Sequence, residues 1–278
     1  MIGVFDSGHG GLTVMAELLH RFPQRRFVYF GDHAHAPYGD KTGAQIVAHT
    51  KAALEVLFEQ GCTLVVMACN TASAAAARTL QTEWLPTAHA GKRVLGIIAP
   101  TVEAATQTPW SVKTPQFPQK YNTDTIALFG TSVTVNSGVF ETEVAKRCPQ
   151  ARVVGQACPA LVPLLERGAP EDELRTEVEK YVAELLARSK HTPEWAILGC
   201  THYPLIAHMF RAALPAATRM LNQPLAVANA LEDYLARHPE FDSPTPHAQP
   251  VYLTSGNAAE VSRVAQLFTG QPLVFQKA

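Results

Sequence analysis

Short apolar runs alternate with longer amphipathic stretches along almost the whole chain. We expect strands at residues 2–5, 27–30, 64–68, 94–98, 125–129, 152–154, 195–198 and 250–253. We expect helices at residues 42–60, 72–80, 136–146, 172–189 and 258–268. Strands that alternate with helices are typical of parallel sheets with helices on both faces. The predicted fold class is therefore α/β. The proline-rich segment 106–122 interrupts the pattern and is expected to be a surface loop or hinge, and residues 238–249 form a second proline-rich region.

The composition excludes several classes of protein. Of the 278 residues 47% are hydrophobic and 17% are charged, a balance that supports a buried core. The net charge is −1 and the longest basic run is Arg25-Arg26, so we expect no nucleic-acid partner. No stretch approaches the ~18 apolar residues of a membrane span, and the first residues lack a basic leader. We therefore expect a cytoplasmic protein with no membrane contact.

The chain has five cysteines, an odd number without regular spacing. They are Cys62, Cys69, Cys148, Cys158 and Cys200. Such a set does not predict a disulfide framework, and in a reducing compartment these residues are thiols. Some of them are expected to be ordinary buried side chains, because free cysteine behaves as a small hydrophobic residue.

Two segments of the chain resemble each other around a cysteine. Residues 64–71 and residues 195–202 each contain an apolar run, a small residue, a cysteine, and then a residue with a hydroxyl or amide group. A second resemblance pairs residues 2–8 with residues 126–132. The repetition indicates two related halves that face each other.

Cys69 and Cys200 are the strongest candidates for chemistry. Each follows a predicted strand and precedes a predicted helix, at the edge of a parallel sheet where ligands bind. A helix N-terminus stabilises a thiolate, which can act as a general base, while a thiol can act as a general acid. Two such groups on opposite faces of a carbon atom can invert a stereocentre. The alternative is that both are buried structural cysteines, but their matching contexts favour the functional interpretation.

Asp6 and His202 lie close in sequence to these features. Asp6 begins a glycine-rich turn, residues 6–11, which departs from a dinucleotide-binding pattern and suits a substrate carboxylate or amino group better. Asp6 could bind an ammonium group or tune a thiol, and the alternative is a helix N-cap. His202 could polarise the nearby thiol. No second pair with zinc-like spacing accompanies Cys200 and His202, so we expect no metal.

Several hydroxyl and amide side chains flank the two cysteines and the second repeated segment. They are Asn70, Thr71, Thr131, Ser132 and Thr201. These groups suit the recognition of a carboxylate, and they also suit N-capping of the helices that follow. Both roles can hold at once.

Several motifs together make the chain resemble the glutamate racemases of the aspartate/glutamate racemase family. The matching segments are residues 4–14, 36–39, 67–73, 130–131, 198–205 and 254–257. The segments Cys-Asn-Thr-Ala-Ser, from Cys69, and Gly-Cys-Thr-His-Tyr-Pro-Leu, from Gly199, are highly specific. The resemblance covers nearly the whole chain.

The resemblance implies two pseudo-symmetric α/β domains with the active site between them. We expect a discontinuous first domain, residues 1–99 with 215–278, and a second domain, residues 100–214. It also implies interconversion of L- and D-glutamate with no cofactor and no metal, and a supply of D-glutamate for peptidoglycan synthesis. The family commonly forms homodimers.

The resemblance also implies roles for individual residues. The thiol at Cys69 deprotonates the D isomer and the thiol at Cys200 deprotonates the L isomer, with Asp6 and His202 assisting them and Glu166 nearby. The positions that match substrate contacts are Ser7, Pro37, Tyr38, Gly39, Asn70, Thr71, Thr131, Thr134 and Thr201.

Two other functions remain open at this point. The substrate could be aspartate or another amino acid, because pocket shape sets such selectivity. The chain could also be a non-catalytic carboxylate-binding regulatory protein on the same scaffold, although the two intact cysteines argue against this. One departure from the family pattern is the pair His33 and His35, which is unusual in the segment before Pro37.

Overall fold

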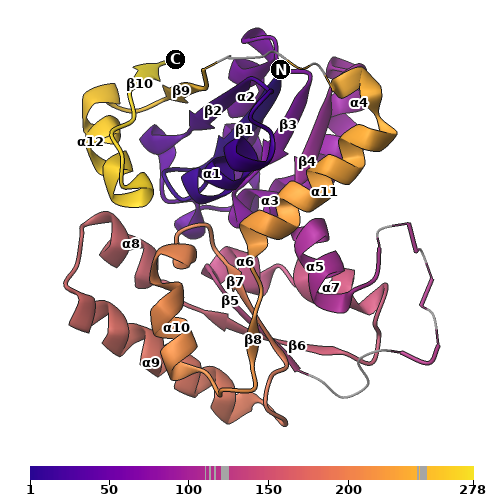
Figure 1. The fold of residues 1–278 in the computed structure, drawn as a ribbon, viewed down its shortest axis with the longest axis vertical. Helices are drawn as coiled ribbons and strands as arrows, with labels where there is room; N and C mark the ends of the chain where they lie inside the picture. The colour runs from indigo at the N-terminus through magenta and orange to yellow at the C-terminus, as the bar shows by residue number, and fades with distance from the viewer. Residues whose placement is uncertain (110, 113, 116, 120–124, 243, 245–248) are drawn as a thin grey trace. The chain divides into compact units, whose positions relative to one another are not determined.

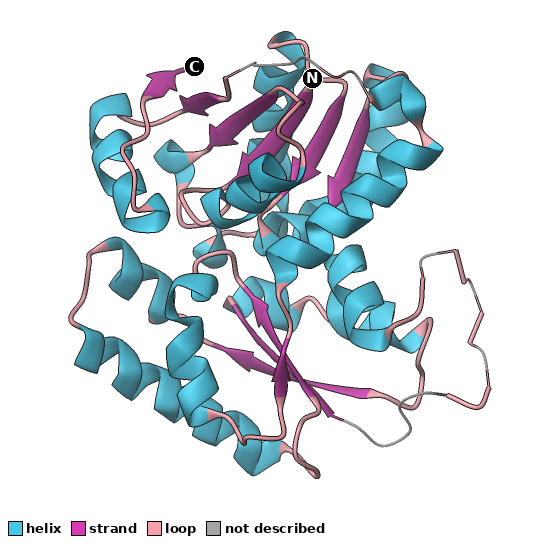
Figure 2. Ribbon diagram, in the orientation of Figure 1, coloured by secondary structure: helices cyan, strands magenta, loops and turns pink. Residues whose placement is uncertain are grey.

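The computed structural model describes residues 1–278 except 110, 113, 116, 120–124, 243 and 245–248. The chain forms two compact units. Unit one contains Met1–Ile97 and Pro224–Ala278, and unit two contains Ile98–Gln223. Each unit combines a parallel sheet with helices, so the predicted α/β class is confirmed (Figures 1 and 2).

Unit one contains a six-stranded parallel sheet with the order β10-β9-β2-β1-β3-β4. Its strands are β1 (Ile2–Asp6), β2 (Phe27–Gly31), β3 (Leu64–Met67), β4 (Arg93–Gly96), β9 (Val251–Thr254) and β10 (Phe275–Lys277). Every residue of β1, β2 and β3 is buried. These strands are continuous apolar runs in the sequence because helices cover both faces of a parallel sheet.

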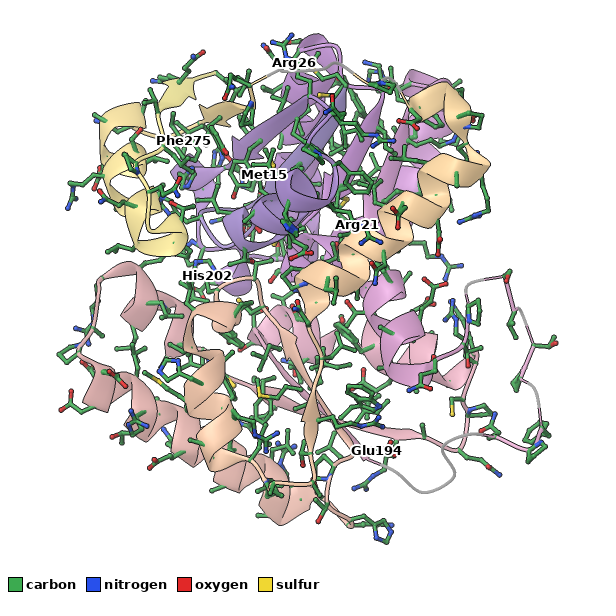
Figure 3. All side chains as sticks on the ribbon, viewed as in Figure 1. Met15, Arg21, Arg26, Glu194, His202 and Phe275 are labelled. Carbon is green, nitrogen blue, oxygen red and sulfur yellow. The ribbon has the colours of Figure 1, made fainter. Side chains whose placement is uncertain are left out.

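The helices of unit one pack in pairs. They are α1 (Leu12–Arg21), α2 (Gly43–Glu59), α3 (Asn70–Thr79), α4 (Leu85–Ala88) and α12 (Ala258–Thr269), with the shorter helical segments η1 (His33–His35), η2 (Tyr38–Asp40), η3 (Leu80–Trp84) and η5 (Pro239–Phe241). Helix α1 packs against α12, and α2 packs against α3. Thr42 and Gln45 form a capping box that sets the start of α2. Arg21, at the end of α1 and labelled in Figure 3, pairs with Glu232 of helix α11 (Gln223–Arg237).

Unit two contains a four-stranded parallel sheet with the order β6-β5-β7-β8. Its strands are β5 (Thr125–Gly130), β6 (Arg152–Ala157), β7 (Trp195–Gly199) and β8 (Arg219–Met220). Phe129 and Leu198 of the sheet, Val178 of the longest helix, and Phe210 belong to one buried apolar cluster. Burial of these side chains stabilises the unit.

Helices surround the sheet of unit two. They are α5 (Ile98–Thr106), α6 (Ser132–Asn136), α7 (Val139–Ala145), α8 (Leu161–Glu166), α9 (Glu171–Arg188), η4 (Tyr203–Ile206) and α10 (Ala207–Ala213). Helix α11 (Gln223–Arg237) begins at the last residue of unit two and continues in unit one. Among the described residues, no helix has both the length and the apolar character needed to cross a bilayer.

Several of the expected elements have other bounds in the structure, among them the helix at 136–146 and the strand at 94–98. The helix expected at residues 136–146 begins only at Val139, as α7, because Gly138 adopts a left-handed backbone conformation (φ 65°) between it and α6, which ends at Asn136. The strand expected at residues 94–98 ends at Gly96, and Ile98 begins α5. Positions 110, 113, 116, 120–122, 243 and 245–248 of the two proline-rich segments lie outside the described residues, as do positions 123 and 124.

The two sheets repeat one arrangement of four strands. The order β2-β1-β3-β4 in unit one corresponds to β6-β5-β7-β8 in unit two. The registers also correspond, because Ile2 pairs with Leu64 and Ile126 pairs with Trp195. These four residues begin the segments that resemble each other in the sequence. The internal repeat is therefore a repeat of strand order and register.

A first prediction concerns Gly11, at the N-cap of α1. A Cβ atom at this position would lie 2.5 Å from Cβ of Asp6 and 3.2 Å from Cβ of Ala68. We expect Gly11→Ala to lower the free energy of unfolding by about 1–3 kcal/mol, because overpacking forces backbone shifts. Urea denaturation measures the change. Gly43→Ala is the matched control, because a Cβ there meets nothing within 4 Å, and unchanged stability in both variants would contradict the prediction.

Candidate active site

In unit one, strand register brings predicted site residues together at the carboxyl edge of the sheet. Phe5 pairs with Met67 in the parallel ladder of β1 and β3, so Ser7 and Cys69 are the corresponding residues beyond the two strands. Oγ of Ser7 lies 3.4 Å from Sγ of Cys69. The hydroxyl is therefore within hydrogen-bonding distance of the thiol.

Cys69 is the N-cap residue of α3, as the strand–helix pattern predicted. Its Sγ accepts a hydrogen bond from the backbone N–H of Ala72 at 3.4 Å, and the side chain is buried. Asn70 and Thr71 form the first turn of α3 and are also buried. Backbone N–H groups at a helix start stabilise negative charge. The local structure thus suits a thiolate at Cys69.

Asp6 is fully buried at the end of β1. Its Oδ2 accepts a hydrogen bond from the backbone N–H of Gly8 at 2.9 Å. The N-cap of α1 is Gly11, so the interpretation of Asp6 as a helix N-cap is wrong. Asp6 instead orders the glycine-rich turn.

Tyr29 supports the same turn from β2. Its hydroxyl donates to the backbone oxygen of Gly8 at 2.7 Å. Burial, and then the charges of Asp6 and Cys69, raise the pKa of Tyr29 well above its usual value. Tyr29 therefore remains a neutral hydrogen-bond donor. Sequence reasoning did not select it, because its apolar context is typical of a core strand.

Tyr38 lies on η2 and is buried, whereas Pro37 beside it is exposed and Gly39 is partly exposed. The hydroxyl of Tyr38 donates to Oδ2 of Asp32 at 2.7 Å. Burial and the neighbouring Asp32 carboxylate raise the pKa of Tyr38, so this side chain also stays neutral. Asp32 was missed as a site residue. Its position immediately after β2, comparable to that of Asp6 at the end of β1, was the available signal.

In unit two, Cys200, His202 and Glu166 form a chain of polar contacts. Sγ of Cys200 lies 3.9 Å from Nδ1 of His202, and Nε2 of His202 lies 3.0 Å from Oε1 of Glu166. Burial lowers the pKa of His202, but hydrogen bonds to Cys200 and Glu166 outweigh burial and raise it to about 10. His202 is therefore positively charged at neutral pH, a form that stabilises a thiolate at Cys200.

Cys200 does not lie at the start of an α-helix, contrary to expectation. A turn follows β7, and the short 3₁₀ segment η4 begins at Tyr203. The proline at position 204 favours this tight geometry. His202, labelled in Figure 3, accordingly provides the positive charge that a helix N-terminus was expected to provide.

The other three cysteines, Cys62, Cys148 and Cys158, are buried, and two of them have a raised pKa. Burial raises the pKa of Cys62 to about 11. Burial and then the nearby Cys200 raise the pKa of Cys158 well above its usual value. Neither thiol is poised to exchange protons near neutral pH.

The hydroxyl residues of unit two serve the local fold. Thr131 is the N-cap of α6, where its Oγ1 accepts from the backbone N–H of Thr134 at 3.2 Å. The two threonine hydroxyl oxygens are 3.0 Å apart, and Thr134 is fully buried. Thr201 is buried beside Cys200. The capping role is confirmed for Thr131, and substrate binding by these residues stays a prediction.

The whole chain resembles known racemases. The family model described as Asp/Glu/Hydantoin racemase matches residues 7–229. The chain therefore belongs to this family. It is an amino acid racemase, because curated relatives that match over their full length are named glutamate racemase.

Relatives and solved structures agree in length as well as fold. The chain is 47% identical to a glutamate racemase of Caulobacter sp. strain K31, with 100% of this chain and 99% of the relative covered. It resembles the structure of a glutamate racemase isoform of Bacillus anthracis with a TM-score of 0.86 and 25% identity, covering 100% of this chain and 97% of the other. The glutamate racemase of Thermus thermophilus in complex with β-chloro-D-alanine gives a TM-score of 0.81 and 29% identity, covering 100% and 96%.

A second prediction concerns the charge of His202. Because its pKa in the folded protein is about 10, above the ordinary value of 6.5, the stability that it contributes is fully present below pH 6.5 and is lost as the pH rises through 10. We expect Glu166→Gln to lower the pKa of His202 and shift this loss of stability to lower pH. Nitrogen-15 NMR of the histidine rings, together with thermal unfolding across this pH range, measures both effects.

The matched control is Glu173→Gln, which removes a carboxylate from the exposed ion pair with Arg167. This variant should leave the titration of His202 unchanged. A midpoint for His202 near 6.5 in the unsubstituted protein would contradict the proposed interaction with Glu166 and Cys200.

Proposed function

We propose that this racemase interconverts L- and D-glutamate by a two-base mechanism in which Cys69 and Cys200 exchange protons with the α-carbon. The main support is that the two thiols follow equivalent strands, β3 and β7, in the strand order that the two sheets share. The curated relatives named glutamate racemase support glutamate as the substrate.

The proposed chemistry moves one proton in and one proton out. The thiolate of one cysteine removes the α-hydrogen as a proton, which leaves a carbanion stabilised by the substrate carboxylate. The thiol of the other cysteine then donates its proton to the opposite face of the same carbon. One S–H bond forms and one breaks, so the reaction is balanced without an oxidant or a cofactor.

The surroundings of the two thiols suit opposite directions of the reaction. We propose that Cys69 deprotonates D-glutamate, supported by the Ala72 amide and by the hydroxyl of Ser7. In the opposite direction, Cys200 deprotonates L-glutamate, supported by His202 and, through His202, by Glu166. Asp6 has a positioning role, because its carboxylate orders the turn that carries Ser7.

Substrate binding is assigned to hydroxyl, amide and backbone groups near the two thiols. The proposed contacts are Ser7, Pro37, Tyr38, Gly39, Asn70, Thr71, Thr131, Thr134 and Thr201. Neutral donors of this kind bind carboxylates with good geometry and low desolvation cost. The proposal extends to a homodimer in the cytoplasm that supplies D-glutamate for peptidoglycan synthesis.

Circular dichroism tests the activity directly. Purified protein incubated with L-glutamate and no added cofactor should abolish the optical signal of the amino acid as the racemic mixture forms. In deuterium oxide, deuterium should appear at the α-carbon of the product. Turnover of aspartate in place of glutamate would overturn the substrate assignment, and tight binding of glutamate without isotope exchange would overturn the catalytic one.

A third prediction separates the two thiols. Cys69→Ala and Cys200→Ala should each lower racemisation by at least about 10²–10⁴-fold, the usual contribution of one general acid or base. We expect the Cys69→Ala protein to exchange the α-hydrogen of L-glutamate only, and the Cys200→Ala protein that of D-glutamate only. Proton NMR in deuterium oxide measures exchange for each enantiomer.

Cys62→Ala is the matched control, because this thiol is buried in the core and is not assigned to the reaction. Its turnover should equal that of the unsubstituted protein even if its stability falls. Racemisation that persists in both Cys69→Ala and Cys200→Ala would refute the two-base proposal.

A further inference from the structure

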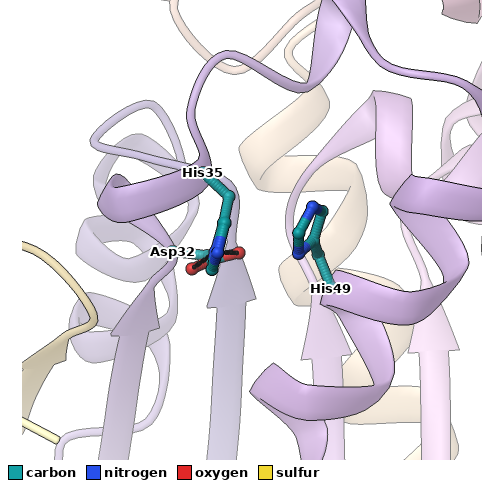
Figure 4. Close-up of side chains that lie close together, drawn as sticks. All are labelled: Asp32, His35 and His49. Carbon is teal, nitrogen blue, oxygen red and sulfur yellow. Dashed lines mark hydrogen bonds and ion pairs between the residues drawn. The ribbon is translucent and has the colours of Figure 1, made fainter.

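Unit one contains a cluster of metal-ligating side chains that the proposed reaction does not use. Asp32, His35 and His49 each offer one donor atom, and these three atoms lie within 4.8 Å of one another. Figure 4 shows the two imidazole rings beside the carboxylate. The residues come from the end of β2, from η1 and from α2.

Asp32 is a buried carboxylate whose position is fixed by its neighbours. Its Oδ1 accepts from the hydroxyl of Ser255 at 2.6 Å, and its Oδ2 accepts from the hydroxyl of Tyr38 at 2.7 Å. Nδ1 of His35 lies 2.8 Å from Oδ1 and 3.0 Å from Oδ2. An ionised carboxylate has about four lone-pair sites. Asp32 can therefore keep its two hydroxyl donors and still ligate an ion.

The two histidines are held face to face. Their ring centroids are 4.0 Å apart and the rings are inclined by 23°. His35 is exposed, with 46% of its side chain accessible, while His49 is partly buried on α2. An ion from solvent can thus reach the cluster at His35, and a ring on the short η1 segment can adjust its position.

We propose that Asp32, His35 and His49 form a binding site for a divalent transition-metal ion of the Zn²⁺ class. Two imidazole nitrogens and one carboxylate oxygen are donors that suit zinc, whereas calcium and magnesium prefer oxygen ligands. With zinc–ligand bonds of about 2.0–2.2 Å, donor atoms of a tetrahedral site are about 3.3–3.6 Å apart. The ion takes the place of the proton between Nδ1 of His35 and Asp32, and the neutral ring of His35 then carries its proton on Nε2. The ion draws the three donors together, and water completes the coordination.

The site is connected to a segment that the proposed function uses. Asp32 accepts the hydroxyl of Tyr38, which is one of the proposed substrate contacts. The positive charge of an ion on Asp32 weakens the hydrogen bond that the same carboxylate accepts from Tyr38. Zinc therefore lowers racemisation reversibly, a consequence that rests on the proposed function, whereas the site itself does not.

A fourth prediction tests the site by direct binding of Zn²⁺ to the full chain. Isothermal titration is performed in a Cys69→Ser, Cys200→Ser background, so that the two proposed catalytic thiols cannot ligate the ion. We expect one Zn²⁺ per chain. His35→Gln and His49→Gln should each weaken binding more than about tenfold, because even residues outside the ligand set change metal affinity by this amount.

His20→Gln is the matched control, because His20 is an exposed histidine in the last turn of α1. It should bind Zn²⁺ as tightly as the background protein, and far-ultraviolet circular dichroism should show that every variant is folded. Absence of binding in the background protein would overturn the site. If the His35→Gln or the His49→Gln variant bound Zn²⁺ as tightly as the background protein, the site would also be overturned.

Activity provides the second readout, with the native cysteines restored. Zn²⁺ should inhibit racemisation in the unsubstituted protein, a chelator should reverse the inhibition, and His49→Gln should require at least about tenfold more Zn²⁺ for the same effect. Equal inhibition of both proteins would overturn the link to Tyr38. The binding titration does not depend on turnover. A protein that binds Zn²⁺ but does not racemise glutamate would therefore support the metal site and contradict only the proposed function.

Discussion

The parallel pairing of β1 with β3, and of β5 with β7, is the constraint that positions the proposed site residues around Cys69 and around Cys200. Equal register in the two pairs, Ile2 with Leu64 and Ile126 with Trp195, brings a hydroxyl residue and a cysteine to corresponding places at each sheet edge. A slip of register would separate these partners along the strands. Burial of β1 on both faces makes such a slip costly, so the apolar core fixes the chemistry at its edge.

The two units repeat the same strand order, but the groups that polarise the two thiols differ between them. Cys69 receives an amide hydrogen bond at the start of α3, which is a property of the helix itself. Cys200 precedes a turn and a 3₁₀ segment, and a charged histidine lies beside it instead. The proposed thiolate is thus stabilised by backbone geometry at Cys69 and by a side-chain pair, His202 with Glu166, at Cys200.

Much of the fold could be predicted because hydrophobic periodicity reports burial directly. The core strands β1, β2 and β3 were found for this reason, whereas β8, with two residues, and β10, with three, are too short to produce a pattern. The positions of Cys69 and Cys200 directly after a strand could also be predicted from the sequence. Asp32 and His49 were not, because 17 positions separate them and only the packing of α2 beside the end of β2 brings them together.

Ser255 helps to position Tyr38, a proposed substrate contact, although Ser255 itself is not proposed to touch the substrate. It follows β9, and its hydroxyl donates to Asp32, the carboxylate that also accepts Tyr38. Strand β9 in turn is held between β2 and the terminal strand β10. A protein truncated before β9 would keep every residue proposed to contact the substrate. It would lose the hydroxyl of Ser255, which helps to hold Asp32 and therefore Tyr38. Tags and fusions at the carboxyl terminus therefore act on a part of the molecule that helps to hold Tyr38, a proposed substrate contact, in place.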